Sequence, residues 1–119
     1  MLIVDDQPAV CIALASFCDE LALTYVVAGD GELALRAFVE HHPELVITDV
    51  QMPRLSGFQL IARIRALAPV PILVLSMLGQ SQDVEQARRL GATAYLVKPV
   101  SLSAFRASVL AALGAGFRP

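Results

Sequence analysis

Short apolar runs alternate along the chain with longer segments in which apolar residues recur every three or four positions. The short runs are rich in Val, Ile and Leu, which is typical of strands buried on both faces of a parallel sheet. The longer segments have the spacing of helices that bury one face. Five such strand–helix pairs predict an α/β domain with a parallel sheet, right-handed crossovers and helices on both faces. The predicted strands cover residues 2–4, 23–28, 45–49, 72–76 and 94–97.

The helical segments also carry signals at their ends. Pro8 suits the first turn of a helix that runs to about Glu20, because the N–H that proline lacks would have no partner there. Pro43 closes the second helix, and Ser101 can cap the fifth. The residues expected to face the core are Val10, Leu14, Phe17, Cys18 and Leu21 in the first helix, Leu33, Ala34, Ala37 and Phe38 in the second, Leu60, Ile61, Ile64 and Leu67 in the third, and Leu102, Phe105, Val109 and Leu113 in the fifth.

The fourth helix, at about residues 81–90, differs from the others. Its apolar residues reduce to Val84, Ala87 and Leu90, and charged or amide side chains surround them. A narrow apolar stripe of this kind predicts shallow anchoring against the sheet. We therefore expect this helix to move more easily than the other four.

Length, composition and charge limit the classes of function. A chain of 119 residues fits one domain, and its apolar share of 56% suits a sheet that is covered on both faces. Nine Lys and Arg residues against eleven Asp and Glu residues give a net charge of −2. Because the chain has no basic cluster, we do not expect it to bind nucleic acid directly. No apolar run is long enough to span a membrane, and Asp5 and Asp6 stand where a signal peptide needs positive charge, so we expect a cytoplasmic chain.

The two cysteines, Cys11 and Cys18, fall on the first predicted helix. Seven residues of helix separate their α-carbons by ~10.5 Å, whereas a disulfide needs less than ~7 Å. We expect both to be reduced and to face the core. An intramolecular redox pair is the alternative.

Polar side chains end four of the apolar runs. Asp5 and Asp6 follow the first strand, Asp49 ends the third, Ser76 ends the fourth and Lys98 follows the last. The carboxyl ends of parallel strands share one edge of a sheet, where ligands of open α/β domains bind. The sequence therefore predicts that three acids, a hydroxyl and an ammonium group converge on one small pocket.

This combination of groups favours phosphoryl-transfer chemistry. Two like charges ~4 Å apart cost up to ~4 kcal/mol at an effective dielectric constant of ~20, so the clustered carboxylates call for a cation. Oxygen ligands suit a hard divalent ion such as Mg²⁺. Lys98 and Ser76 could both contact a phosphoryl oxygen while Asp49 attacks phosphorus as the nucleophile.

The same residues, in the same order, resemble a known family. The chain closely resembles the receiver domain of bacterial two-component response regulators over nearly its whole length. The resemblance implies a flavodoxin-like sheet of strand order 2-1-3-4-5, with Asp49 accepting the phosphoryl group of a phosphohistidine on a sensor histidine kinase or phosphotransfer protein. The residues that carry it are Ile3-Val4-Asp5-Asp6-Gln7-Pro8, Gly29-Asp30-Gly31, Thr48-Asp49 with Met52-Pro53 and Gly57, Ser76, Gly91-Ala92 and Tyr95-Leu96-Val97-Lys98-Pro99.

The resemblance also implies the composition of the site. Mg²⁺ would be held by Asp6, Asp49 and the backbone carbonyl of Gln51, with Asp5 assisting through water. The peptide bond of Lys98-Pro99 would be cis, which aims Lys98 into the pocket. Such a domain catalyses only its own phosphorylation and dephosphorylation, so it is not a turnover enzyme.

A switch is implied as well. On phosphorylation the Ser76 hydroxyl would be drawn toward the phosphoryl group, and Tyr95 would rotate into the space it leaves. The fourth helix, last strand and fifth helix would then form the readout surface. The alternative for Tyr95 is ordinary packing within its strand.

Two positions near the site depart from the family or vary within it. Met77 follows Ser76 where the family usually has a small residue, so we expect its flexible thioether to crowd the route to Asp49. Gln51 stands at a position that varies in the family and influences how water reaches the acyl phosphate. Both residues are therefore expected to tune kinetics.

Domain organisation and partners follow from the same resemblance. Residues 1–113 are predicted to form the receiver domain, and residues 114–119 a tail or the start of a linker to an absent output domain. The downstream partner would be that output domain or a separate protein in transcriptional or other signalling control. A homodimer is left open, and no membrane partner is expected.

Three alternatives share parts of the pattern. A phosphorylation-independent interaction module could keep every one of these residues. A small aspartate-nucleophile phosphatase would need a second Asp two places after Asp5, where this chain has Gln7, and extra length for a cap. A flavin mononucleotide binder would place a phosphate where Asp5 and Asp6 would repel it.

His41 and His42 could suggest a metal site. Their place at the predicted end of a helix favours another interpretation, because imidazoles there complement the helix dipole.

Overall fold

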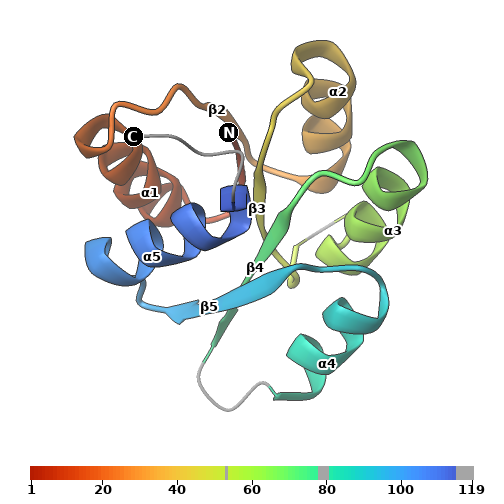
Figure 1. Ribbon diagram of the computed structural model, residues 1–119. Helices are drawn as coiled ribbons and strands as arrows, with labels where there is room; N and C mark the ends of the chain where they lie inside the picture. Colours follow the sequence, from red (N-terminus) through yellow and green to blue (C-terminus); the bar gives the residue numbers. More distant parts are fainter. Residues whose placement is uncertain (53, 78–80, 115–119) are drawn as a thin grey trace.

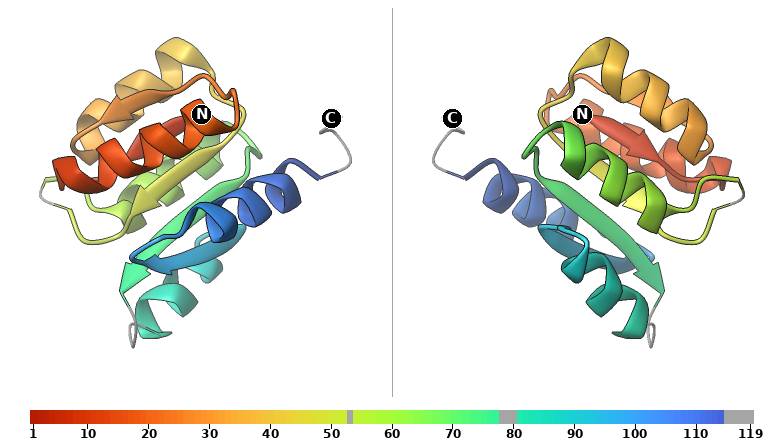
Figure 2. Two further views of the ribbon diagram at one scale, coloured as in Figure 1. Left: turned by 90° about the vertical axis from the view of Figure 1, so that its left-hand side faces the viewer. Right: turned by 90° about the vertical axis from the view of Figure 1, so that its right-hand side faces the viewer.

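A parallel sheet forms the middle layer of the molecule, and helices cover both of its faces (Figures 1 and 2). The computed structural model describes residues 1–52, 54–77 and 81–114, so Pro53 of the family motif and residues 115–119 of the predicted tail lie outside it. The strands are β1 (Leu2–Val4), β2 (Val26–Ala28), β3 (Val46–Asp49), β4 (Ile72–Met77) and β5 (Ala94–Lys98). The helices are α1 (Pro8–Glu20), α2 (Gly31–His41), α3 (Gly57–Leu67), α4 (Ser81–Arg89) and α5 (Leu102–Leu113).

The strand order is β2-β1-β3-β4-β5, and every neighbouring pair is parallel. This is the flavodoxin-like topology that the family resemblance implied. Alternate residues of each strand enter opposite cores, as the pleat requires. Ile3, Ile47 and Leu73 pack under α1 and α5, whereas Leu2 and Val46 pack under α2, α3 and α4. Figure 2 shows these two helix layers on either side of the sheet.

The predicted helix ends are largely confirmed. Pro8 is the first residue of α1, and the Ser101 side chain accepts a hydrogen bond from the Ala104 N–H at the start of α5. α2 ends with His41, and His42 caps it in the left-handed conformation at φ 49°. Of α4, which the structure describes in full, only Ala87 is buried, so its shallow anchoring is also confirmed.

Several sequence expectations were wrong in detail. β2 begins at Val26 instead of residue 23, because the Leu23 N–H donates to the Cys18 carbonyl and so continues the end of α1. Leu33 is 50% exposed, since it is offset by about 100° from Ala34, the buried residue that follows it. The other apolar residues that were assigned to helix core faces but are exposed lie at helix ends, and they are Leu67 and Leu102.

The cysteines are free and buried, as predicted. Cys18 has no exposed surface, and burial raises the pKa of its thiol to about 11. Burial also raises the pKa of Cys11, and the charge of Asp5 adds to the effect. Within the described residues, no helix has the length and apolar character needed to cross a membrane.

Candidate functional site

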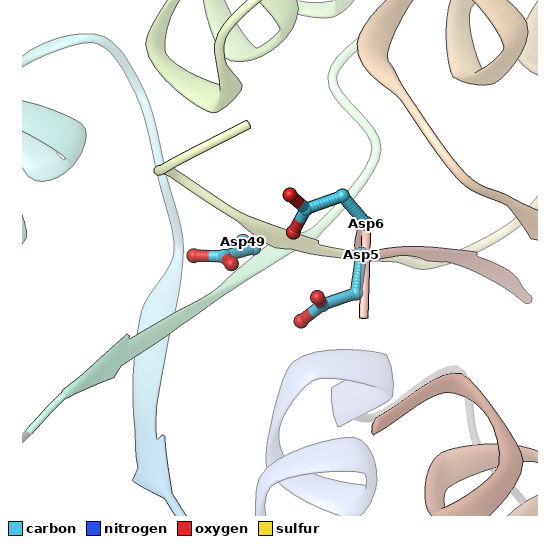
Figure 3. A group of neighbouring side chains, drawn as sticks. All are labelled: Asp5, Asp6 and Asp49. Carbon is cyan, nitrogen blue, oxygen red and sulfur yellow. The ribbon is translucent and has the colours of Figure 1, made fainter. Parts of the chain in front are cut away.

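Three carboxylates meet at the carboxyl edge of the sheet (Figure 3). Val4 of β1 pairs with Thr48 of β3, so the residues that follow, Asp5 and Asp49, lie side by side at this edge of the sheet. Together with Asp6, each contributes a carboxylate oxygen, and these oxygens all lie within 4.8 Å of one another. Asp5 and Asp49 are 1% and 7% exposed, whereas Asp6 is exposed to solvent. The predicted convergence of the acids is thus found in the fold.

Lys98 brings the positive charge of the site. It is the last residue of β5, and its side chain is only 14% exposed. Its Nζ lies 2.9 Å from Asp5 Oδ2 and 3.0 Å from Asp49 Oδ2. Nζ also donates a longer hydrogen bond, of 3.4 Å, to the Gln7 side-chain oxygen. One ammonium group therefore lies between two buried carboxylates. The peptide bond from Lys98 to Pro99 is cis.

Burial dominates the electrostatics of Asp5. It raises the pKa of the Asp5 carboxyl even though Lys98 and the Gln7 N–H lower it, and the nearby charge of Asp49 raises it further. Among the described residues, Asp5 Oδ2 has no hydrogen-bond partner of suitable geometry, so its short contact with Lys98 is an ion pair without a directed hydrogen bond.

The pKa of Lys98 is also raised, which for an ammonium group favours the charged form. Burial disfavours its charged form, but the contacts with Asp5 and Asp49 outweigh burial and raise the pKa of the ammonium group. A single lysine faces three carboxylates, so the cluster keeps an excess of negative charge. A divalent cation with oxygen ligands fits this donor set.

Ser76 and Tyr95 lie on neighbouring strands with very different exposure. Ser76 is 4% exposed near the end of β4, beside Val97 of β5. Tyr95 pairs with Val74 and is 53% exposed, so its ring is not packed in the core. Tyr95 lines a cavity of about 340 Å³ between β5 and α4, next to Ala87. A hollow of this size beside the ring leaves room for a change of its orientation.

Met77 lies beside Lys98, and Gln51 lies beside Asp49. Met77 is 63% exposed, pairs with Lys98 across β4 and β5, and lines a groove of about 410 Å³ with Lys98 and Phe17. The Gln51 N–H donates to Asp49 Oδ1 at 3.2 Å. The Gln51 side-chain amide points elsewhere and donates to Asp83 Oδ2 of α4 at 3.1 Å.

Two residues of the site were not singled out as functional from the sequence. Gln7 donates its N–H to Asp5 Oδ1 at 2.9 Å and accepts from Lys98, and its place directly after the acid pair was the available signal. Asp83 contacts Gln51 across 32 positions of sequence, and no local pattern indicates this pair. The contacts from Lys98 to Gln7 and from Gln51 to Asp83 both join segments that are distant in sequence.

Gly57 shows how tightly the loop after β3 is folded. A β-carbon at this position would lie 2.1 Å from the backbone oxygen of Asp49, and the Gly57 N–H donates to the Val50 carbonyl. The Thr48 hydroxyl donates to the same Asp49 oxygen at 2.8 Å. Glycine is therefore required here because backbone approaches backbone directly behind the acid.

Known proteins are similar to this chain in sequence and in fold. The family model described as "Response regulator receiver domain" matches residues 1–110. The probable transcriptional regulator ycf27 of Guillardia theta is 37% identical over 113 residues, which are 95% of this chain and 44% of the relative. The transcriptional regulatory protein PdtaR of Mycobacterium tuberculosis is 41% identical over 104 residues, which are 87% of this chain and 51% of the relative.

A solved structure agrees. The receiver domain of NtrX from Brucella abortus superimposes with a TM-score of 0.91 at 26% identity, covering 96% of this chain and 98% of that one. The chain belongs to the response regulator receiver domain family, and it is a signalling module. It spans about half the length of the curated relatives that it matches.

Proposed function

We propose that this receiver domain accepts a phosphoryl group on Asp49 from the phosphohistidine of a sensor histidine kinase or phosphotransfer protein. The observation that best supports this proposal is the position of the Asp49 carboxylate at the carboxyl edge of the sheet. Its Oδ1 accepts a hydrogen bond from the Gln51 N–H, and its Oδ2 accepts one from Lys98. These two contacts support the proposal because they would hold the carboxylate in one orientation for an incoming phosphorus atom.

The acidic cluster supports a Mg²⁺ site in the same pocket. We assign Asp6, Asp49 and the Gln51 backbone carbonyl as ligands, with Asp5 acting through water. The close approach of three carboxylates and the Asp5 oxygen without a directed hydrogen bond favour this assignment. When bound, the ion would supply positive charge against the phosphoryl oxygens.

The side chains have complementary roles in the transfer. A carboxylate oxygen of Asp49 forms a bond to phosphorus while the bond from phosphorus to the histidine nitrogen breaks, and the imidazole leaves. Lys98 and the Ser76 hydroxyl stabilise charge on the phosphoryl oxygens. Water later attacks phosphorus, which restores the Asp49 carboxylate and releases phosphate. The domain therefore acts on itself and is not a turnover enzyme.

The signal would leave through α4, β5 and α5. Ser76 moves toward the phosphoryl group, and Tyr95 turns into the space that Ser76 leaves. The exposed ring and the cavity between β5 and α4 support this role, and so does the shallow anchoring of α4. Phosphorylation favours one of two states only as far as its contacts differ between them.

The output is proposed from the relatives, which are described as transcriptional regulators about twice as long as this chain. Residues 1–113 would be the receiver domain, and residues 114–119 a tail or the start of a linker to an output domain. A separate downstream protein is the other candidate target, and the oligomeric state of the chain is left open.

Because the chain has a net charge of −2, we do not propose that it binds nucleic acid itself. The cytoplasmic location remains a prediction.

Intact-mass spectrometry tests the proposal. Wild type and Asp49→Ala are incubated with acetyl phosphate and Mg²⁺, and a wild-type sample also receives EDTA. We expect only the wild-type sample without EDTA to gain the mass of one phosphoryl group. A gain that persists in Asp49→Ala would reject Asp49 as the acceptor.

Further results separate the alternatives. No gain in wild type or in Met77→Ala, even with a histidine kinase as donor, would indicate a phosphorylation-independent interaction module. Steady turnover of a phosphate monoester would indicate a phosphatase.

A further inference from the structure

We propose that Asp83 of α4 is a positioning residue that holds the Gln51 side chain away from Asp49 and so lengthens the lifetime of the phosphoryl group. The inference rests on the proposed phosphorylation of Asp49. It concerns a contact between the loop after β3 and the first turn of α4. Through this contact, the rate at which the phosphoryl group is hydrolysed would depend on the position of α4 in the readout surface.

Gln51 reaches in two directions. Its backbone nitrogen lies 3.2 Å from Asp49 Oδ1, so the residue is held next to the carboxylate that would carry the phosphoryl group. Its side-chain nitrogen instead lies 3.1 Å from Asp83 Oδ2. The side chain has three rotatable bonds, and the contact with Asp83 selects the rotamer that points to α4.

If Gln51 were released from Asp83, its side-chain amide would be free to contact the phosphoryl group and the attacking water. Its oxygen can accept a hydrogen bond from the attacking water, and its N–H₂ can donate to a phosphoryl oxygen. Glutamine orients water in this way in other phosphoryl transfers to water. Water attacks phosphorus, the bond from phosphorus to the Asp49 oxygen breaks, and inorganic phosphate leaves. We therefore expect release of Gln51 to speed hydrolysis.

Asp83 is suited to couple this chemistry to α4. It lies in the first turn of a helix that buries only Ala87 among its described residues, and its carboxylate is favourably placed near the helix N-terminus. A partner that shifts α4 would move Asp83 with it and break the contact. Phosphoryl lifetime would then depend on what is bound to the readout surface.

The test measures the half-life of the phosphorylated protein by intact-mass spectrometry after the phosphodonor is removed. We expect Asp83→Ala to shorten the half-life roughly two- to fivefold, the range expected from releasing one exposed hydrogen bond. Asp83→Asn keeps an acceptor oxygen at the same place, and we expect it to restore a half-life close to that of wild type. In a Gln51→Ala background, Asp83→Ala should change nothing.

Glu85→Ala is the matched control. It removes an acid from the same helix, but Glu85 pairs with Arg88 and Arg89 and not with Gln51. An equal shortening in Glu85→Ala and Asp83→Ala would overturn the inference, because helix destabilisation would explain both. Normal phosphorylation with an unchanged half-life in Asp83→Ala would overturn the inference alone. A wild type that no donor phosphorylates would overturn the proposed function together with it.

Discussion

Lys98 Nζ lies 2.9 Å from Asp5 Oδ2, yet among the described residues this carboxylate oxygen has no directed hydrogen bond. The pKa of the Asp5 carboxyl is raised, chiefly by burial, so the contact with Lys98 offsets only part of the cost of burying this acid. A raised pKa in the folded state means that protonation of Asp5 favours folding. Its stabilising contribution is complete below the unfolded value and is lost as pH rises through the folded value. At neutral pH the charged Asp5 is thus destabilising.

We expect Asp5→Asn to increase the free energy of unfolding at neutral pH in EDTA, by on the order of 1 kcal/mol. Urea denaturation with and without Mg²⁺ measures this, and Mg²⁺ should stabilise wild type more than the variant. Asp6→Asn is the control, since Asp6 is exposed and should matter less without metal. A less stable Asp5→Asn protein would show that the attraction of Lys98 outweighs burial.

Arg65 of α3 joins two segments of backbone, the connection after α3 and the residue Gly91 that follows α4. Its guanidinium donates two hydrogen bonds to the Gly91 carbonyl, at 3.1 and 2.6 Å, and one each to the carbonyls of Ala68 and Val70. We expect Arg65→Met to lower the free energy of unfolding by about 2–4 kcal/mol, because these partly buried carbonyls lose their partner. Arg63→Met, on the exposed side of α3, should lower it by less than about 0.5 kcal/mol in the same urea titration.

The loop behind Asp49 should not tolerate a side chain at Gly57. A β-carbon there would meet the Asp49 backbone oxygen at 2.1 Å, so we expect Gly57→Ala to destabilise the fold by about 1–3 kcal/mol or more. Gly29→Ala is the matched control, because a β-carbon there has nothing within 4 Å. Thermal unfolding of both variants tests this, and equal melting temperatures would contradict the crowding.

The two thiols should be unreactive in the folded protein. Cys18 is fully buried with a pKa of about 11, and Cys11 is 7% exposed with a raised pKa, so little thiolate is accessible at pH 8. We expect a disulfide reagent to label both residues only on unfolding, with a rate that increases with added urea. Rapid labelling of the native protein would contradict this burial.

Met77 should slow the approach of small phosphodonors. It pairs with Lys98 across the strands and is largely exposed beside it. We expect Met77→Ala to increase the rate of phosphorylation by acetyl phosphate by a factor of about two to three, equivalent to removing a small steric barrier. Leu110→Ala, which removes a partly exposed apolar side chain from α5, is the control. An unchanged or slower rate in Met77→Ala would reject the crowding.

Much of this protein could be predicted from the sequence. The continuous Val, Ile and Leu runs indicated a sheet covered on both faces, and the polar residues at their ends placed Asp5, Asp49 and Lys98 in one pocket. The reason is that parallel strands with right-handed crossovers bring all carboxyl ends to one edge. The narrow stripe of α4 likewise predicted its shallow anchoring.

Other features were decided by tertiary structure. Helical periodicity assigned Leu33, Leu67 and Leu102 to the core, but they are exposed, because the spacing of apolar residues does not show where the covering layer ends. The unequal partnering of Lys98 with its two carboxylates depends on the geometry of three strand ends. The contact from Gln51 to Asp83 depends on a loop and a helix that are distant in sequence. Local pattern indicated the acids and the lysine of the site, whereas packing determines which atoms they contact and which further residues join them.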